Sequence, residues 1–190
     1  MLYAGTIFLS SFLLFLVQPL IARLILPWFG GSAAVWTTCM LSFQALPLAG
    51  YASRHLLTKP PSRRPEAGIH SALLVLATAT LPISPSEAWK PAGEDEPVSR
   101  ILLLLGASVG LPYFLLAATS PLLQAWFARA RPGEDPYRLF AVSNLASLIA
   151  LVGYPFVVEP NLGGVGHVRV WSWLLCAFAA PCAAVDWVTP

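Results

Sequence analysis

Residues 5–27 read GTIFLSSFLLFLVQPLIARLILP, a stretch in which Arg23 is the single charged residue. An α-helix rises about 1.5 Å per residue, so roughly 20 apolar residues cross a hydrocarbon core of about 30 Å. Backbone amides inside lipid find no water, and a run of this length must therefore satisfy them within a helix. The stretch predicts a transmembrane helix.

Similar apolar runs follow along nearly the whole chain. Together with the first, they lie near residues 5–27, 33–53, 69–86, 99–127, 136–158 and 168–188. The chain is 57% hydrophobic and 11% charged, whereas a soluble domain carries about 25% charged residues. We expect an all-α integral membrane protein in which residues 1–190 form one domain of six transmembrane helices, with no soluble catalytic domain.

Lysine and arginine are unevenly divided between the two sides of this arrangement. One side holds Arg54, Lys59, Arg63, Arg64, Arg129, Arg131 and Arg138. The other side holds Arg23, Lys90, Arg100 and Arg169, together with the acidic patch Glu94–Glu96. Because short cytoplasmic loops carry the excess of basic residues, we expect both termini to be cytoplasmic.

Polar side chains recur at helical spacing inside several apolar runs. Polar groups are costly in lipid and usually face a neighbouring helix or a cavity. The candidate polar seam consists of Gln18, Thr37, Gln44, Tyr51, Tyr113, Ser120, Gln124 and Asn144. Two interpretations stay open: a site lined for a substrate or water, or interhelical hydrogen bonds worth about 0.6 kcal/mol each.

A candidate ion pair joins the first and fifth runs. Arg23 lies about one turn inside the outer end of the first run, and Glu159 lies at the outer end of the fifth. The expected topology places both on the same side at similar depth, so we predict that they pair or share a polar network. The alternative is that each side chain extends separately to the headgroups.

Small residues and prolines mark further features of the expected helices. Gly106 and Gly110 form a GxxxG pair, and Ala146, Ala150 and Gly153 form a second stripe, both typical of close helix packing. Prolines that interrupt the runs are Pro19, Pro47, Pro112, Pro121 and Pro155. Broken helices mark binding sites in some transporters, although proline is also common in membrane helices generally.

The sequence contains no recognisable catalytic or metal-binding motif. Cys39, Cys176 and Cys182 form no CxxC pair, and the acidic residues lie in loops or at helix ends. The net charge of +2 is too small to suggest a nucleic-acid partner. We expect no catalytic site, no metal and no cofactor, and a proton relay is disfavoured.

Two stretches carry a family resemblance. They are LLFLVQPLIARLILPWFGGSAAVWTTCMLSFQ at 13–44 and GLPYFLLAATSPLLQAWFARARPGEDPYRLFAVSNLASLIALVGYPFVVEP at 110–160. Both resemble the amino-terminal membrane region of bacterial spermidine-synthase-like membrane proteins, in which half of a major-facilitator fold is fused to a synthase. The matching polar positions are Gln18, Arg23, Gln44, Gln124, Asp135, Tyr137, Arg138, Asn144 and Glu159.

The resemblance implies a bacterial-type inner membrane and half of a major-facilitator fold. The family's aminopropyltransferase domain would follow the last run, but the sequence ends at Pro190, so we expect no enzyme activity. Expected partners are the lipid bilayer, a second copy or other membrane subunits, and a small polar ligand. The function expected is a non-catalytic module that binds or transports a small polar metabolite with a partner half or a synthase-like partner. The alternative is a structural or anchoring subunit of a membrane complex.

Overall fold

The computed structural model of the chain describes residues 1–57, 63–91 and 97–188. Within these ranges the chain is helical and contains no β-strand. The main helices are α1 (Leu2–Phe29), α2 (Ala33–Leu57), α3 (Arg63–Ala79), α4 (Pro97–Leu105), α5 (Leu111–Ala130), α6 (Tyr137–Gly153) and α8 (Gly164–Val188). Shorter segments are the 3-10 turn η1 (Glu87–Trp89), the π-helical η2 (Gly106–Gly110) and η3 (Tyr154–Val158), and α7 (Glu159–Asn161).

The π-helical segments join shorter helices into two continuous rods, Pro97–Ala130 and Tyr137–Asn161. Pro112 lies two residues after the end of η2, in the first turn of α5, and Pro155 lies within η3. Proline has no amide hydrogen and its ring displaces the carbonyl one turn earlier, which is a known cause of such local widening. The other predicted interruptions lie within continuous α-helix: Pro19, Pro47 and Pro121.

The third helix differs from the one predicted at 69–86. It begins at Arg63 and ends at Ala79, and residues 81–86 are not helical. The early end agrees with Pro82, because a proline disfavours α conformation in the residue before it. The early start includes Glu66, which is held by contacts to α5.

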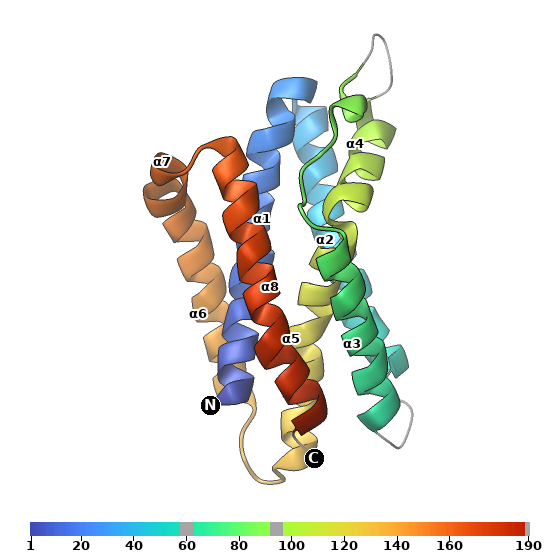
Figure 1. The fold of residues 1–190 in the computed structure, drawn as a ribbon, viewed down its shortest axis with the longest axis vertical. Helices are drawn as coiled ribbons and strands as arrows, with labels where there is room; N and C mark the ends of the chain where they lie inside the picture. Colours follow the sequence, from blue (N-terminus) through green and yellow to red (C-terminus); the bar gives the residue numbers. More distant parts are fainter. Residues whose placement is uncertain (58–62, 92–96, 189–190) are drawn as a thin grey trace.

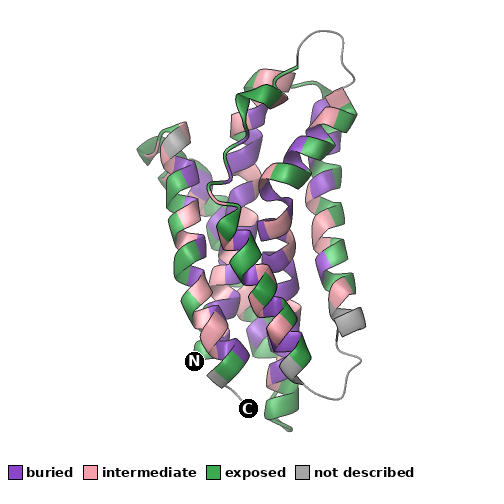
Figure 2. Ribbon diagram, turned by 45° about the vertical axis from the view of Figure 1, so that its right-hand side comes forward, coloured by how far each residue is buried: buried purple, intermediate pink, exposed green. Residues whose placement is uncertain are grey.

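The helices stand side by side in one elongated bundle, with both chain ends at the same end (Figure 1). α1 is central and contacts α5, α6 and α8, while α5 also contacts α2 and α3. Buried positions concentrate on these central helices, and the peripheral ones carry many exposed positions (Figure 2). α6 is peripheral and packs chiefly against α1.

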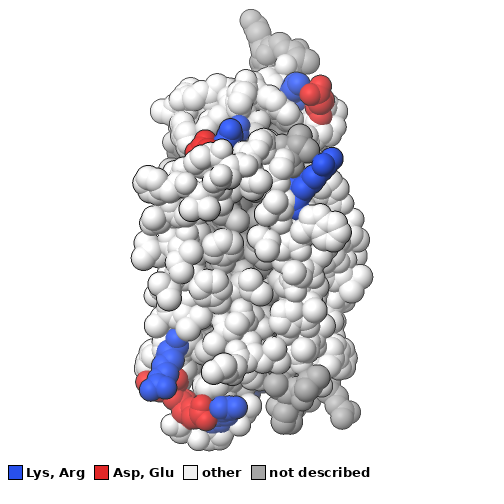
Figure 3. All heavy atoms as spheres, turned by 60° about the vertical axis from the view of Figure 1, so that its left-hand side comes forward, with Lys and Arg blue, Asp and Glu red and all other residues white. Residues whose placement is uncertain are grey.

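Four helices in the described ranges are long and apolar enough to cross a membrane: Leu2–Phe29, Pro97–Ala130, Tyr137–Asn161 and Gly166–Trp187. Charged side chains lie toward the two ends of the face in Figure 3, and a broad uncharged band separates them. This distribution indicates an all-α protein surrounded by lipid. α2 and α3 are not among these four helices. α3 has only 17 residues, which give a rise of about 26 Å, and α2 carries several hydroxyl and amide side chains.

The structure locates some of the basic residues from which cytoplasmic termini were predicted. Arg131 and Arg138 line a cavity with Met1, so these basic residues lie at the end of the bundle that holds the amino terminus. Lys59 and Glu94–Glu96 lie outside the described residues. The side chains of Arg54, Arg63 and Arg64 also lie outside the described part of the chain.

Small residues pack closely at positions that differ in part from those expected. Ala146 and Ala150 are buried on α6, which packs against α1. A Cβ built on Gly106 or Gly153 meets no atom within 4 Å, because both face open space. Gly110 is buried, but the nearest atom to its Cβ position belongs to its own chain segment, the Leu105 carbonyl at 3.7 Å. The predicted GxxxG pair therefore makes no close helix contact within this bundle.

Candidate functional site

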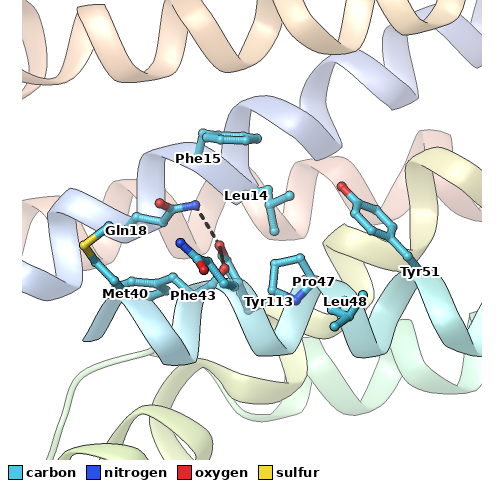
Figure 4. A pocket seen from close by; sticks show the side chains of 10 residues that line it. Leu14, Phe15, Gln18, Met40, Phe43, Pro47, Leu48, Tyr51 and Tyr113 are labelled. Atoms are coloured by element: carbon cyan, nitrogen blue, oxygen red, sulfur yellow. Dashed lines mark hydrogen bonds between the residues drawn. The ribbon is translucent and has the colours of Figure 1, made fainter. Parts of the chain in front are cut away.

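A groove runs along α1 and α2 and holds several of the predicted polar residues. Its first part is a cavity of about 520 Å³ lined by residues of α1, α2 and α5. Gln18, Gln44, Tyr51 and Tyr113 contribute its polar groups. The remaining lining is apolar: Leu14, Phe15, Met40, Phe43, Pro47 and Leu48. Figure 4 shows Gln18 and Tyr51 toward opposite ends of this cavity.

One hydrogen-bond chain crosses the groove and joins three helices. The Gln18 side-chain amide on α1 donates to the Tyr113 hydroxyl on α5 at 2.7 Å (Figure 4). The Tyr113 hydroxyl donates in turn to the Phe43 carbonyl on α2 at 3.2 Å. The Tyr113 side chain is fully buried, and its hydroxyl both accepts and donates a hydrogen bond. The accepted bond holds the Gln18 side chain at the cavity wall.

The second part of the groove lies nearer the opposite end of the bundle from the chain termini. It is a cavity of about 740 Å³, and it shares Gln18, Met40 and Phe43 with the first. Arg23 and Glu159 also line it. The shared residues make the two cavities one continuous, mostly apolar groove with polar groups at several levels.

Arg23 and Glu159 lie together in this wider part. Arg23 Nη1 on α1 donates to Glu159 Oε1 on α7 at 3.0 Å. Their side chains are 40% and 47% exposed, so both remain accessible from the groove or the surface. The pair supplies a positive and a negative group to the wider part of the mostly apolar groove.

The remaining seam residues lie away from these cavities or bond locally. Thr37 is exposed on α2 and donates to its own helix, at the Ala33 carbonyl. The Gln124 amide donates to Ser120 Oγ one turn earlier on α5, at 3.1 Å. Asn144 is exposed on α6. The structure thus brings together Gln18, Gln44, Tyr51 and Tyr113, but it does not extend the seam to these residues.

Two buried carboxylates, which the sequence places near helix ends, form a second polar region. Glu66 on α3 accepts from Trp126 Nε1 at 2.6 Å and from Arg129 at 2.6 and 3.2 Å. The Glu66 side chain is 0% exposed and that of Arg129 is 44% exposed. This bidentate ion pair links the start of α3 to the end of α5.

The other buried carboxylate is Asp186, near the end of α8. His70 Nδ1 on α3 lies 3.0 Å from Asp186 Oδ1, with both side chains almost fully buried. Ser71 Oγ donates to Asp186 Oδ2 at 2.8 Å, and Cys182 Sγ lies 4.0 Å from His70 Nδ1. Sequence spacing carried a signal for this cluster, since Cys182 and Asp186 lie four residues apart, on one helical face.

Comparison with protein-family models, with curated proteins and with solved structures gave no match. The geometry of the groove and of the buried polar clusters is therefore the basis for assigning a function.

Proposed function

We propose that this chain is a non-catalytic membrane module that binds or transports a small polar metabolite in the groove between α1 and α2. In this proposal all six predicted segments cross the membrane and both termini are cytoplasmic, as in half of a major-facilitator fold. A bacterial-type inner membrane follows from the family resemblance. Four sufficiently apolar helices support the membrane setting, and the juxtaposition of Met1 with Arg131 and Arg138 supports the cytoplasmic side proposed for the amino terminus.

The observation that carries the proposal is the Gln18–Tyr113 hydrogen bond at the wall of an open cavity. A purely structural seam would leave no cavity beside its polar groups, whereas Gln18 and the exposed Gln44 and Tyr51 line about 520 Å³ of space next to the buried Tyr113 hydroxyl. Ligand sites typically combine an apolar wall with a few fixed polar groups, and this groove has that composition. Gln124, which bonds to Ser120, does not line either cavity.

A second half or partner would complete the site. The groove opens at the side of the bundle, and alternating access in transporters requires one bundle to rock against another. A partner half or a synthase-like partner would close the open side and exclude lipid from the ligand. The proposed role therefore belongs to an assembly, of which this chain supplies one wall.

The test is equilibrium binding of labelled spermidine and labelled myo-inositol to the chain purified in mild detergent with its co-purifying partners. We expect saturable binding of one probe, weakened at least fivefold by Gln18→Leu. Gln124→Ala is the matched control, because it removes an amide outside the groove and should leave binding unchanged. Absence of saturable binding, or equal loss in both variants, would contradict the proposal.

A structural or anchoring subunit is the second candidate, and the exposed apolar surface of α6 is the face at which it would meet its neighbour. Large apolar side chains are exposed along this helix and the π-helical segment that continues it, including Leu145 and Leu148 on α6 and Phe156 and Val157 on η3. Lipid or another protein could cover such a face equally well on chemical grounds. The two candidates differ because a subunit requires a fixed protein neighbour at α6.

A photo-crosslinking residue at Leu148 distinguishes a protein neighbour from lipid. The structural candidate predicts one discrete protein adduct at Leu148 in native membranes. Leu103 on α4 is a matched control, since it is 64% exposed and should yield lipid adducts. Lipid adducts at both positions would remove the support that α6 gives to the subunit candidate.

A further inference from the structure

We propose that His70, Cys182 and Asp186 form a binding site for a divalent transition metal of the zinc class, between α3 and α8. This departs from the expectation of no metal, which rested on spacing along the sequence. The three residues offer one nitrogen, one sulfur and one carboxylate oxygen, and these ligand atoms all lie within 4.8 Å of one another. The site is separate from the groove and does not depend on the function proposed for it.

The two separations from His70 are close to those of tetrahedral coordination, and the third, between Cys182 and Asp186, lies within 4.8 Å. Bonds of about 2.0 Å to nitrogen or oxygen and 2.3 Å to sulfur place neighbouring ligand atoms about 3.3–3.8 Å apart. His70 Nδ1 lies 3.0 Å from Asp186 Oδ1 and 4.0 Å from Cys182 Sγ. Both separations differ from the ideal range by only a few tenths of an ångström. Three protein ligands leave the fourth position for a water molecule.

The surrounding hydrogen bonds orient these ligands. The Thr119 hydroxyl donates to the Leu115 carbonyl at 2.8 Å, so its oxygen is available to accept from His70 Nε2–H at 3.0 Å. This leaves His70 Nδ1 directed at Asp186 and Cys182. A metal-bound histidine almost always donates its other N–H in this way.

The carboxylate is oriented by a second chain of donors. Ser71 Oγ donates to Asp186 Oδ2 at 2.8 Å, and Trp187 Nε1 donates to Ser71 Oγ at 3.0 Å. His70 Nδ1 lies 3.0 Å from Asp186 Oδ1 and 3.1 Å from Oδ2, so both oxygens face the ring and Oδ1 is the one not bonded to Ser71. Hydrogen bonds to the second carboxylate oxygen are also typical of the outer shell of metal sites.

Charge balance and ligand type define the class of ion. A thiolate and a carboxylate together carry two negative charges, which a divalent cation neutralises within a buried site. With a neutral imidazole as the third ligand, the occupied site carries no net charge. Sulfur and imidazole ligands favour zinc or cobalt over magnesium or calcium, which prefer oxygen.

Cobalt spectroscopy of the purified chain tests the site. After chelator treatment, Co²⁺ should bind with one equivalent per chain and give a thiolate charge-transfer band together with the d–d bands of tetrahedral cobalt. Cys182→Ser should abolish the charge-transfer band. Cys176→Ser is the matched control, because Cys176 is an exposed cysteine on the same helix and should leave the spectrum unchanged.

Zinc-edge X-ray absorption of the wild-type protein gives a second measurement that does not depend on the folding of any variant. We expect one sulfur ligand, with nitrogen and oxygen ligands completing the shell. A zinc shell without sulfur, or no stoichiometric metal binding, would overturn the proposal. A cobalt thiolate band that persists in folded Cys182→Ser, or disappears in Cys176→Ser, would do the same.

Discussion

Arg129 Nη2 lies 2.6 Å from Glu66 Oε2, and this ion pair joins the end of α5 to the start of α3. The carboxylate is completely buried and the guanidinium is only partly so. Trp126 provides a third hydrogen bond to the same carboxylate. Since a buried charge is costly without its partners, these contacts hold the polar beginning of α3 in the bundle.

Arg129→Ala should strongly destabilise the protein, because it leaves Glu66 buried with Trp126 as its remaining partner among the contacts above. Removing one member of a buried ion pair typically costs about 3–5 kcal/mol, and the partial exposure of Arg129 places the expected loss at about 3 kcal/mol. The measurement is the free energy of unfolding in mixed micelles. Glu66→Gln should cost less, because it removes the buried charge together with the pair.

The matched control for this prediction is Arg131→Ala. Arg131 pairs with Glu134 at 3.2 Å, and both side chains are more than half exposed. Exposed pairs contribute about 0–1 kcal/mol, so the control should lie close to wild type. Equal effects of the two arginine substitutions would contradict the importance assigned to the Glu66 contact.

Tyr113→Phe should reduce stability by about 1 kcal/mol while preserving the fold. The substitution keeps the buried ring but removes the hydroxyl that links Gln18 to the Phe43 carbonyl. Interhelical hydrogen bonds in membrane proteins contribute about 0.6 kcal/mol on average, and two such bonds are lost here. Unfolding in mixed micelles measures the change, and Tyr137→Phe, which alters an exposed tyrosine, is the control. A Tyr113→Phe protein as stable as this control would show that the hydroxyl bonds are replaced by water.

Charge reversal should test the Arg23–Glu159 pair. Arg23→Glu and Glu159→Arg should each lower the free energy of unfolding, and the double substitution should recover part of the loss. The pair is about half exposed, so the expected coupling energy is about 0.2–1 kcal/mol at low salt. A double variant whose loss equals the sum of the single losses would mean that the two charges do not interact in the membrane. Repeating the cycle at high salt should reduce the coupling, because salt screens exposed charges.

Much of the helical architecture follows from the apolar runs, because lipid requires every spanning backbone to satisfy its own hydrogen bonds. The third helix is the main exception. Its first turn contains arginines, a proline and Glu66, which are typical of a loop, yet Trp126 and Arg129 from α5 bond to Glu66. A contact between residues about 60 positions apart in sequence has no local signal.

Helical spacing identifies the faces of the candidate site but not their neighbours. The seven-residue interval places Gln44 and Tyr51 on one face of α2, and both line the first cavity. The same reasoning grouped Gln124 with Tyr113, although Gln124 bonds to Ser120 on its own helix. Asp186 lies near the end of its helix and is nevertheless buried, because α3 packs against α8 at this level. A position near the end of a helix therefore does not show that a side chain is exposed, because a neighbouring helix can cover it.

Gly50→Ala should separate α2 from α5 and destabilise the bundle. A Cβ at Gly50 would lie 3.0 Å from Ala117 Cβ, 3.1 Å from the Phe114 carbonyl oxygen and 3.2 Å from the Ala118 amide nitrogen. Two of these atoms belong to the α5 backbone and cannot move aside as a flexible side chain would. Overpacking of this kind typically costs about 1–3 kcal/mol, and the gain of about 1 kcal/mol in helix propensity from glycine to alanine offsets only part of it.

Gly5→Ala is the control for this last prediction, because a Cβ at Gly5 meets no atom within 4 Å and alanine favours the helix by about 1 kcal/mol. We therefore expect opposite signs for the two glycine substitutions in unfolding measurements. Gly50→Ala should also weaken ligand binding in the groove, since α2 carries Gln44 and Tyr51 on its cavity face. If Gly50→Ala were as stable as Gly5→Ala, α2 would not pack against α5 as closely as the structure places it. The groove between α1 and α2 would then have a different width from the one on which ligand binding is proposed.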